Sequence, residues 1–306
     1  MVGRLGRSPE WPIGRLGPYS RLRMIRLDAA SFLLQWAVGG LFFTWITTRR
    51  REVGLGYGWL MRVIFGLLAL GSILVGQAIG PVPVREVSAA GVVVATGVAL
   101  AVSIRRKDAG VSGQRDRVER RSARVAAMTG IDRDEQRFDN TAPEFPAMLD
   151  LVAPAIGLVG LVAAGIDAGS PAWLSVLRIV VGAAFLGSVT DAMGLGHWYL
   201  VQPGLARGPL LELVRWTGWL WPFEVAVMLI PVGMISVLNG TIDDHYGGIL
   251  GWMWVTSAVT TIGLVIVTRA ALRERQYSAV MAATGLLYLA ILTAFGTDLV
   301  ARAVLA

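Results

Sequence analysis

The sequence predicts an all-α, polytopic transmembrane helical bundle with about eight membrane-spanning helices. Three observations predict it: 55% of the 306 residues are hydrophobic, only 16% are charged, and eight long apolar segments alternate with polar connections. A helix needs ~20 apolar residues to cross a hydrocarbon core of ~30 Å. Backbone polar groups must be satisfied inside lipid, and the segments are too long and uniformly apolar for barrel strands, so helices are predicted.

The eight segments also set the domain organisation. In chain order they cover residues 29–48, 59–79, 87–104, 148–168, 173–193, 219–238, 249–268 and 277–301. Helices 1–3 therefore occupy residues 29–104, and helices 4–8 occupy residues 147–306. A basic loop, residues 105–146, separates the two groups, and a basic tail, residues 1–28, precedes them. We expect one helical bundle.

Basic residues predict which side of the membrane each connection faces. Arginine and lysine concentrate in the odd-numbered connections, at positions 49–51, 105–137, 207–215 and 269–275. The even-numbered connections hold few basic residues and carry Asp167, Asp243 and Asp244 instead. Positive residues stay in the cytoplasm, so we expect a multi-pass protein of the cell membrane with both termini outside. The net charge of +7 then reflects topology, and membrane lipids rather than nucleic acid are the expected partners.

The N-terminal tail conflicts with this orientation, because it is rich in arginine and should resist translocation. A translation start at Met24 would remove the conflict, since only Arg26 would then precede the first helix. The alternative is that the tail is genuine, stays inside on the membrane surface, and prevents the first helix from spanning as drawn. The segment lacks the form of a cleavable signal peptide, because its apolar run is long and no small-residue cleavage site follows.

Several kinds of chemistry are excluded by composition. The chain has no cysteine, which rules out disulfides, thiolate metal sites and thiol catalysis. Its two histidines, His197 and His245, are predicted on opposite faces of the membrane, so this chain alone is not expected to hold a bis-histidine haem, nor a metal. Nucleotide-binding, metalloprotease and serine-hydrolase motifs are absent from the sequence. Catalysis by this chain alone is not expected.

Ionisable residues inside apolar helices are costly, and they indicate where function lies. Helices 5 and 6 hold Asp191 and Glu224, together with His197 and Tyr199 at the predicted cytoplasmic interface and Trp219 in the aromatic belt. Pro222 is expected to kink helix 6 two residues before Glu224. If the tryptophans mark the interface, Glu224 lies about one turn below it. We therefore expect these side chains in one band at the cytoplasmic side.

Other polar residues are interpreted as packing contacts. Asp298 and Arg302 lie four residues apart in helix 8 and can pair on one helix face. Gln35 and Gln77 are expected to hydrogen-bond between helices, and Arg178 lies toward the outer side.

The predicted band has the groups that a quinone headgroup needs. His197 or Tyr199 would donate to the carbonyl oxygens, Asp191 or Glu224 would exchange protons, and a tryptophan such as Trp219 would hold the ring. The leading hypothesis is a membrane-integral subunit of a respiratory or electron-transfer complex that works with redox partner subunits. The architecture alone is similar to the haem-free polytopic anchor subunits of respiratory molybdoenzymes, which bind quinone, although no motif is matched.

Two other functions use the same observations. Asp191 and Glu224 would also serve as coupling groups of a proton-coupled secondary transporter. A structural scaffold subunit would use the aromatics as an interface belt and His197 as a helix cap.

The topology is testable by labelling, since the chain has no native cysteine. We expect Ser112→Cys to be protected from an impermeant thiol reagent in intact cells and Thr241→Cys to be labelled. Labelling of the first variant in intact cells would overturn the predicted orientation.

Overall fold

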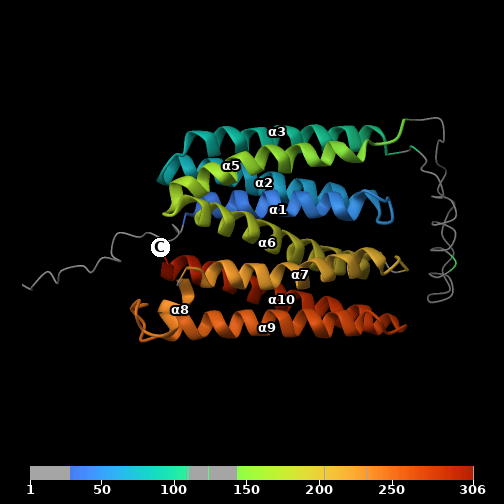
Figure 1. Ribbon diagram of the computed structural model, residues 1–306. Helices are drawn as coiled ribbons and strands as arrows, with labels where there is room; N and C mark the ends of the chain where they lie inside the picture. The colour runs from blue at the N-terminus through green and yellow to red at the C-terminus, as the bar shows by residue number, and fades with distance from the viewer. Residues whose placement is uncertain are drawn as a thin grey trace, which may run out of the picture.

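The computed structural model describes residues 28–107, 109, 123, 143–202, 204–231 and 233–305, and it is an all-helical bundle (Figure 1). The predicted fold class is confirmed. Most of the N-terminal tail, including Met24, and most of the basic loop lie outside the described residues.

The helices follow one another in antiparallel order. They are α1 (Ala29–Thr48), α2 (Leu55–Ile79), α3 (Pro83–Arg105), α5 (Val152–Ala168), α6 (Ala172–Val201), α7 (Gly208–Leu229), α8 (Gly233–Leu238), α9 (Ile249–Ala271) and α10 (Tyr277–Leu305), with a 3-10 turn, η2 (Ala147–Leu151), leading into α5. Among the described residues, seven helices are long and apolar enough to cross a membrane. The remaining long helix is α7, which has 22 residues but carries Glu212, Arg215 and Glu224.

The outer surface of the bundle supports a multi-pass membrane protein. Large apolar side chains point away from the core on several helices, including Leu67 and Leu74 on α2, Ile266 on α9 and Leu292 on α10, each more than 60% exposed. Monomeric soluble proteins rarely expose such extensive apolar surface. With α7, which runs alongside the other long helices in Figure 1, the bundle is consistent with about eight spans.

One predicted segment differs most from the structure in its boundaries. Residues 219–238 were expected to form a single span, but α7 begins at Gly208 and ends at Leu229, and α8 follows as a separate short helix. Pro209 fits the first turn of a helix, where its missing N–H costs nothing. Pro231 cannot donate a helical hydrogen bond, and it disfavours helical geometry at Ile230, so the helix ends there. The helix continues through Pro222.

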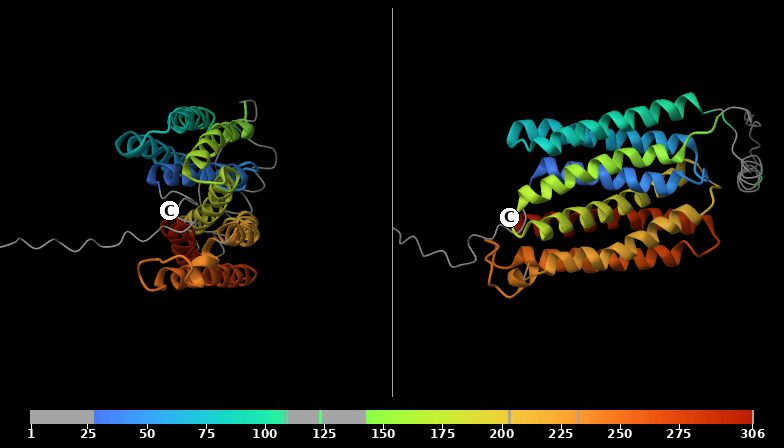
Figure 2. Two further views of the ribbon diagram at one scale, coloured as in Figure 1. Left: turned by 60° about the vertical axis from the view of Figure 1, so that its left-hand side comes forward. Right: turned by 45° about the horizontal axis from the view of Figure 1, so that its top comes forward.

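Helix α1 occupies the centre of the bundle. It packs against α2, α5 and α6, while α6 also packs against α7 and α10. Figures 1 and 2 show α2 and α3 at one edge and α9 at the other. The backbones of α1 and α6 touch, because a Cβ atom built on Gly187 would lie 2.2 Å from the carbonyl carbon of Gly39. Small residues allow such close helix packing within membranes.

The two ends of the bundle differ in charge. The connections after α1, α3, α6 and α9 lie at one end, which we call the basic end because it holds Arg49, Arg106, Arg207 and Arg273. The described chain ends lie at the opposite end (Figure 1). There Asp244 accepts hydrogen bonds from the backbone N–H groups of the turn before α9, and these bonds lower the pKa of its carboxyl.

Candidate functional site

Asp191 of α6 is fully buried and lies among neutral donors. Its Oδ1 accepts hydrogen bonds from the Thr44 hydroxyl at 3.1 Å and the Tyr57 hydroxyl at 3.0 Å. Its Oδ2 is enclosed and receives no hydrogen bond from the described residues. We call Asp191, Thr44 and Tyr57 the Asp191 cluster. An isolated carboxylate is expensive in apolar surroundings, so this environment favours the neutral acid.

A buried ion pair lies closer to the basic end. Arg62 of α2 donates through Nε to Asp150 Oδ1 at 2.9 Å and through Nη2 to Oδ2 at 2.6 Å. Both side chains are about 5% exposed, and the Arg62 guanidinium lies 5.1 Å from the ring centroid of Phe145. This two-pronged geometry suits the planar guanidinium and satisfies both carboxylate oxygens. The pair therefore neutralises two charges that neither helix could bury alone.

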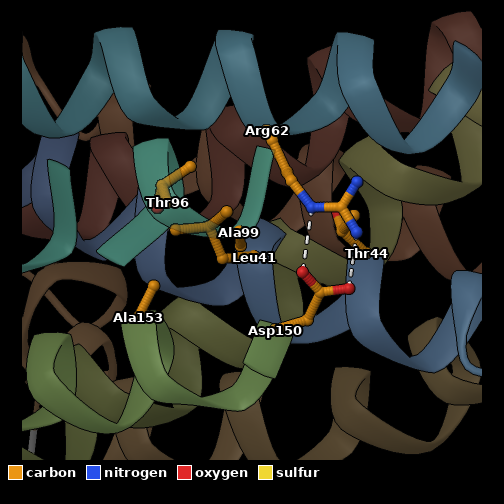
Figure 3. A pocket seen from close by; sticks show the side chains of 7 residues that line it. All are labelled: Leu41, Thr44, Arg62, Thr96, Ala99, Asp150 and Ala153. Atoms are coloured by element: carbon orange, nitrogen blue, oxygen red, sulfur yellow. Dashed lines mark hydrogen bonds and ion pairs between the residues drawn. The ribbon is translucent and has the colours of Figure 1, made fainter. Parts of the chain in front are cut away.

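A small cavity joins this ion pair to the Asp191 cluster. It is lined by Thr44, Arg62, Thr96 and Asp150 together with apolar neighbours, and its volume is about 10 Å³ (Figure 3). That is close to the space needed for one water molecule. Thr96 Oγ1 lies buried without a hydrogen-bond partner among the described residues, so the cavity wall is polar. Thr44 belongs to both sites, because it lines the cavity and donates to Asp191.

Glu224 of α7 lies in a second buried cluster, which we call the Glu224 cluster and which includes Gln35, Asp298 and Arg302. Arg302 donates to Asp298 Oδ2 at 2.7 Å and also to Gln35, whose amide donates to Asp298 Oδ1 at 3.4 Å. All four side chains are fully buried. The expected pairing of Asp298 with Arg302 is confirmed, and Gln35 bridges α1 and α10 as predicted. Gln77, in contrast, is exposed on α2 and has no hydrogen bond among the described contacts.

The carboxyl group of Glu224 lacks hydrogen-bond partners among the described residues. Neither of its carboxyl oxygens receives a hydrogen bond from the described residues, and Nη1 of Arg302 is likewise without a partner there. Its electrostatic neighbours are Asp298, Arg302 and Arg178, and a protonated Glu224 can donate to Asp298. The cluster thus holds two carboxyls and a cation with one unused donor, an arrangement that accommodates either state of Glu224.

Arg178 completes the end of α7. Pro231 lacks the N–H that would bond to the Val227 carbonyl in a continuing helix. Arg178 supplies that donor through Nε at 2.9 Å, and its Nη2 donates to the Ile230 carbonyl at 2.5 Å. A cation at a helix C-terminus also interacts favourably with the helix dipole. Arg178, which belongs to α6, therefore stabilises the end of α7.

The structure separates the residues that were expected in one band. Gly182 of α6 lies beside Gln35 and Asp298, since a Cβ atom there would be 2.6 Å and 2.8 Å from their side chains. Asp191 is nine residues further along α6, which corresponds to ~13 Å of helix. Glu224 lies in the last two turns of α7, away from the basic end. Its expected position was wrong because α7 begins well before Trp219.

The other three candidates contact different neighbours. His197 is exposed, and its Nδ1 shares a hydrogen bond of 2.7 Å with the Tyr288 hydroxyl of α10. Tyr199 is buried and donates to the Ala206 carbonyl at 2.5 Å. Trp219 is 71% exposed on the outer surface of α7. None of the three has a hydrogen bond with Asp191 or Glu224 among the described contacts.

Sequence reasoning missed the partners of Asp191 and the Arg62–Asp150 pair. Arg62 and Asp150 each stand inside a predicted apolar helix, and a charge in such a position is the signal that would have found them. Thr44 and Tyr57 carry no comparable signal, because hydroxyl residues are common in membrane helices.

Comparison of the chain with protein-family models, curated proteins and solved structures finds no match. Among the described residues, no group of three or more His, Asp or Glu side chains is placed to hold a metal ion. The buried polar clusters are therefore the candidate functional sites.

The Arg62–Asp150 pair gives a testable stability prediction. Asp150→Leu leaves a buried guanidinium without its partner and is expected to destabilise the protein by about 3–5 kcal/mol. Adding Arg62→Leu removes that unpaired charge, so the double variant should recover most of the lost stability. Thermal unfolding in detergent measures the stability of the parent and of both variants. A double variant less stable than Asp150→Leu would contradict the pairing argument.

Proposed function

We propose that the protein is a proton-coupled membrane carrier in which Asp191 and Glu224 take up and release the proton, and that it passes protons down their gradient even when no co-substrate is bound. One observation carries the proposal. Both are fully buried carboxyls on the consecutive helices α6 and α7, they lie in opposite halves of the bundle, and both have oxygen atoms that receive no hydrogen bond from the described residues. Such groups in membrane helices commonly mark proton relays.

Polar side chains support a route between Asp191 and the basic end. Thr44 donates to Asp191 and lines the small cavity next to Arg62 and Asp150. A hydroxyl is both a donor and an acceptor, so it can pass a proton between a carboxyl and a water molecule. The proton of Asp191 would exchange through this side of the bundle.

Further hydroxyl groups lie between Asp191 and the Glu224 cluster. The Thr217 hydroxyl of α7 donates to the Ser188 hydroxyl of α6 at 3.0 Å, and both are fully buried. On α6, Ser188 lies between Gly182, which abuts the Glu224 cluster, and Asp191. The unused Nη1 donor of Arg302 would stabilise Glu224 after the proton leaves. The basic end would face the cytoplasm, following the charge distribution.

The quinone-binding subunit and its redox partners stay a prediction from sequence. A quinone site needs donors, a proton-exchanging carboxyl and a ring-holding side chain around one headgroup. Asp191, His197 and Trp219 face different surroundings, namely the α1–α2 interface, the α10 surface and the outer surface. For this reason we favour the carrier over the quinone site.

The proposal is tested by proton flux into liposomes that contain this chain alone. A potassium diffusion potential, negative inside, should drive proton uptake that an enclosed pH dye reports. Asp191→Asn and Glu224→Gln keep the side-chain shape but remove the exchangeable proton, so each should reduce the protein-dependent rate at least tenfold.

Asp243→Asn serves as the matched control, because Asp243 is 76% exposed at the opposite end from the basic one, and it should conduct like the parent. A parent protein whose liposomes take up protons no faster than protein-free liposomes would contradict the proposal. Unchanged rates in both core variants would contradict the assigned roles.

A further inference from the structure

A second, larger cavity opens at the basic end of the bundle and plays no role in the proposed proton route. Its volume is about 670 Å³, and it lies between the connection from α6 to α7 and the connection from α9 to α10. This volume falls within the ~300–1,000 Å³ typical of small-molecule sites. The cavity is therefore large enough for a lipid headgroup.

The lining of the cavity is cationic. Arg207, Arg273 and Arg275 line it, and no acidic side chain is among its lining residues. Arg207 is held in place by donating to the carbonyls of Arg275 and Gln276, both at 2.9 Å, so its charge is fixed within the cavity lining. Arg273 and Arg275 are exposed side chains with no ion pair among the described contacts. Their donors remain available to a ligand.

Two acidic residues lie nearby but do not neutralise all three arginines. Glu274 stands between Arg273 and Arg275 in sequence and is exposed, and Glu52 lies near Gly208 and Tyr199. Three arginines against these two carboxylates leave the cavity with a net positive character. Guanidinium groups match the oxygens of a phosphate group.

The remaining wall is apolar and aromatic. Leu205, Leu211, Leu272 and Val280 line it, together with Tyr199 and Tyr277, whose hydroxyl donates to the Tyr199 carbonyl. A free phosphate would leave this apolar wall without a contact, whereas the glycerol and upper acyl chain of a lipid would cover it. Basic pockets between membrane helices on the cytoplasmic side are known to suit anionic headgroups.

We propose that this cavity binds the phosphate-bearing headgroup of an anionic membrane phospholipid. The arginines hold the phosphate, and the leucines and Val280 contact the apolar portion next to it. The inference is independent of the proton-coupled function, because no residue of the cavity belongs to the Asp191 or Glu224 clusters.

Native mass spectrometry of the purified protein tests the site with defined lipids. Phosphatidylglycerol and phosphatidylcholine with identical acyl chains are added in turn. We expect the parent to retain phosphatidylglycerol preferentially and the variant Arg273→Gln/Arg275→Gln to bind it about tenfold more weakly or worse. The matched control is Arg105→Gln/Arg269→Gln, which removes the same charge from exposed positions at the same end and should bind like the parent.

Further binding measurements distinguish the possible ligands. If inorganic phosphate displaces phosphatidylglycerol at millimolar concentration, the site takes free anions and the commitment to lipid is overturned. If decylubiquinone binding is lost in the arginine variant while phosphatidylglycerol binding is kept, the cavity is a quinone site instead. Equal retention of both phospholipids by the parent would also overturn the proposal.

Leu211→Trp, which fills the apolar part, should weaken phosphatidylglycerol binding without removing any charge.

Discussion

The cost of burying charge in a low-dielectric interior is the constraint on which this structure depends. Arg62 and Arg302 are each neutralised by an aspartate at 2.6–2.7 Å, and Arg85 pairs with both Asp28 and Glu86 at the opposite end. Arg178 is held by two backbone carbonyls at the end of α7. Arg62, Arg85 and Arg302 are each compensated by a carboxylate, and Arg178 by carbonyls at a helix end.

Asp191 and Glu224 depart from this pattern. Asp191 has two hydroxyl donors and no paired cation within the Asp191 cluster, and Glu224 shares its surroundings with the carboxylate of Asp298. A bundle selected only for stability would gain by replacing either residue with an apolar one. The proposed use for a proton gives these two buried carboxyls a role that a scaffold would not need.

Much of the architecture could be predicted because hydrophobicity is a local property. The first segment, residues 29–48, coincides with α1, and the i,i+4 pair of Asp298 and Arg302 follows from helix geometry alone. Contacts between distant helices could not be predicted in this way. Asp150 contacts Arg62, and Asp191 contacts Tyr57, only because the folded bundle brings their helices together. The depth of Glu224 in the membrane was predicted wrongly for another reason. Tryptophans occur along the outer surface of α7, so they do not mark where the membrane interface lies.

The central claim is that Asp191 and Glu224 are neutral acids that can exchange their protons. Infrared spectroscopy of the membrane-embedded protein at neutral pH tests it directly, through the carbonyl stretch that only a protonated carboxyl gives. We predict that Asp191→Asn and Glu224→Gln each remove one component of that band, and that transfer to D₂O shifts both components. A parent band that neither substitution alters would show that both groups are ionised, and it would contradict the account.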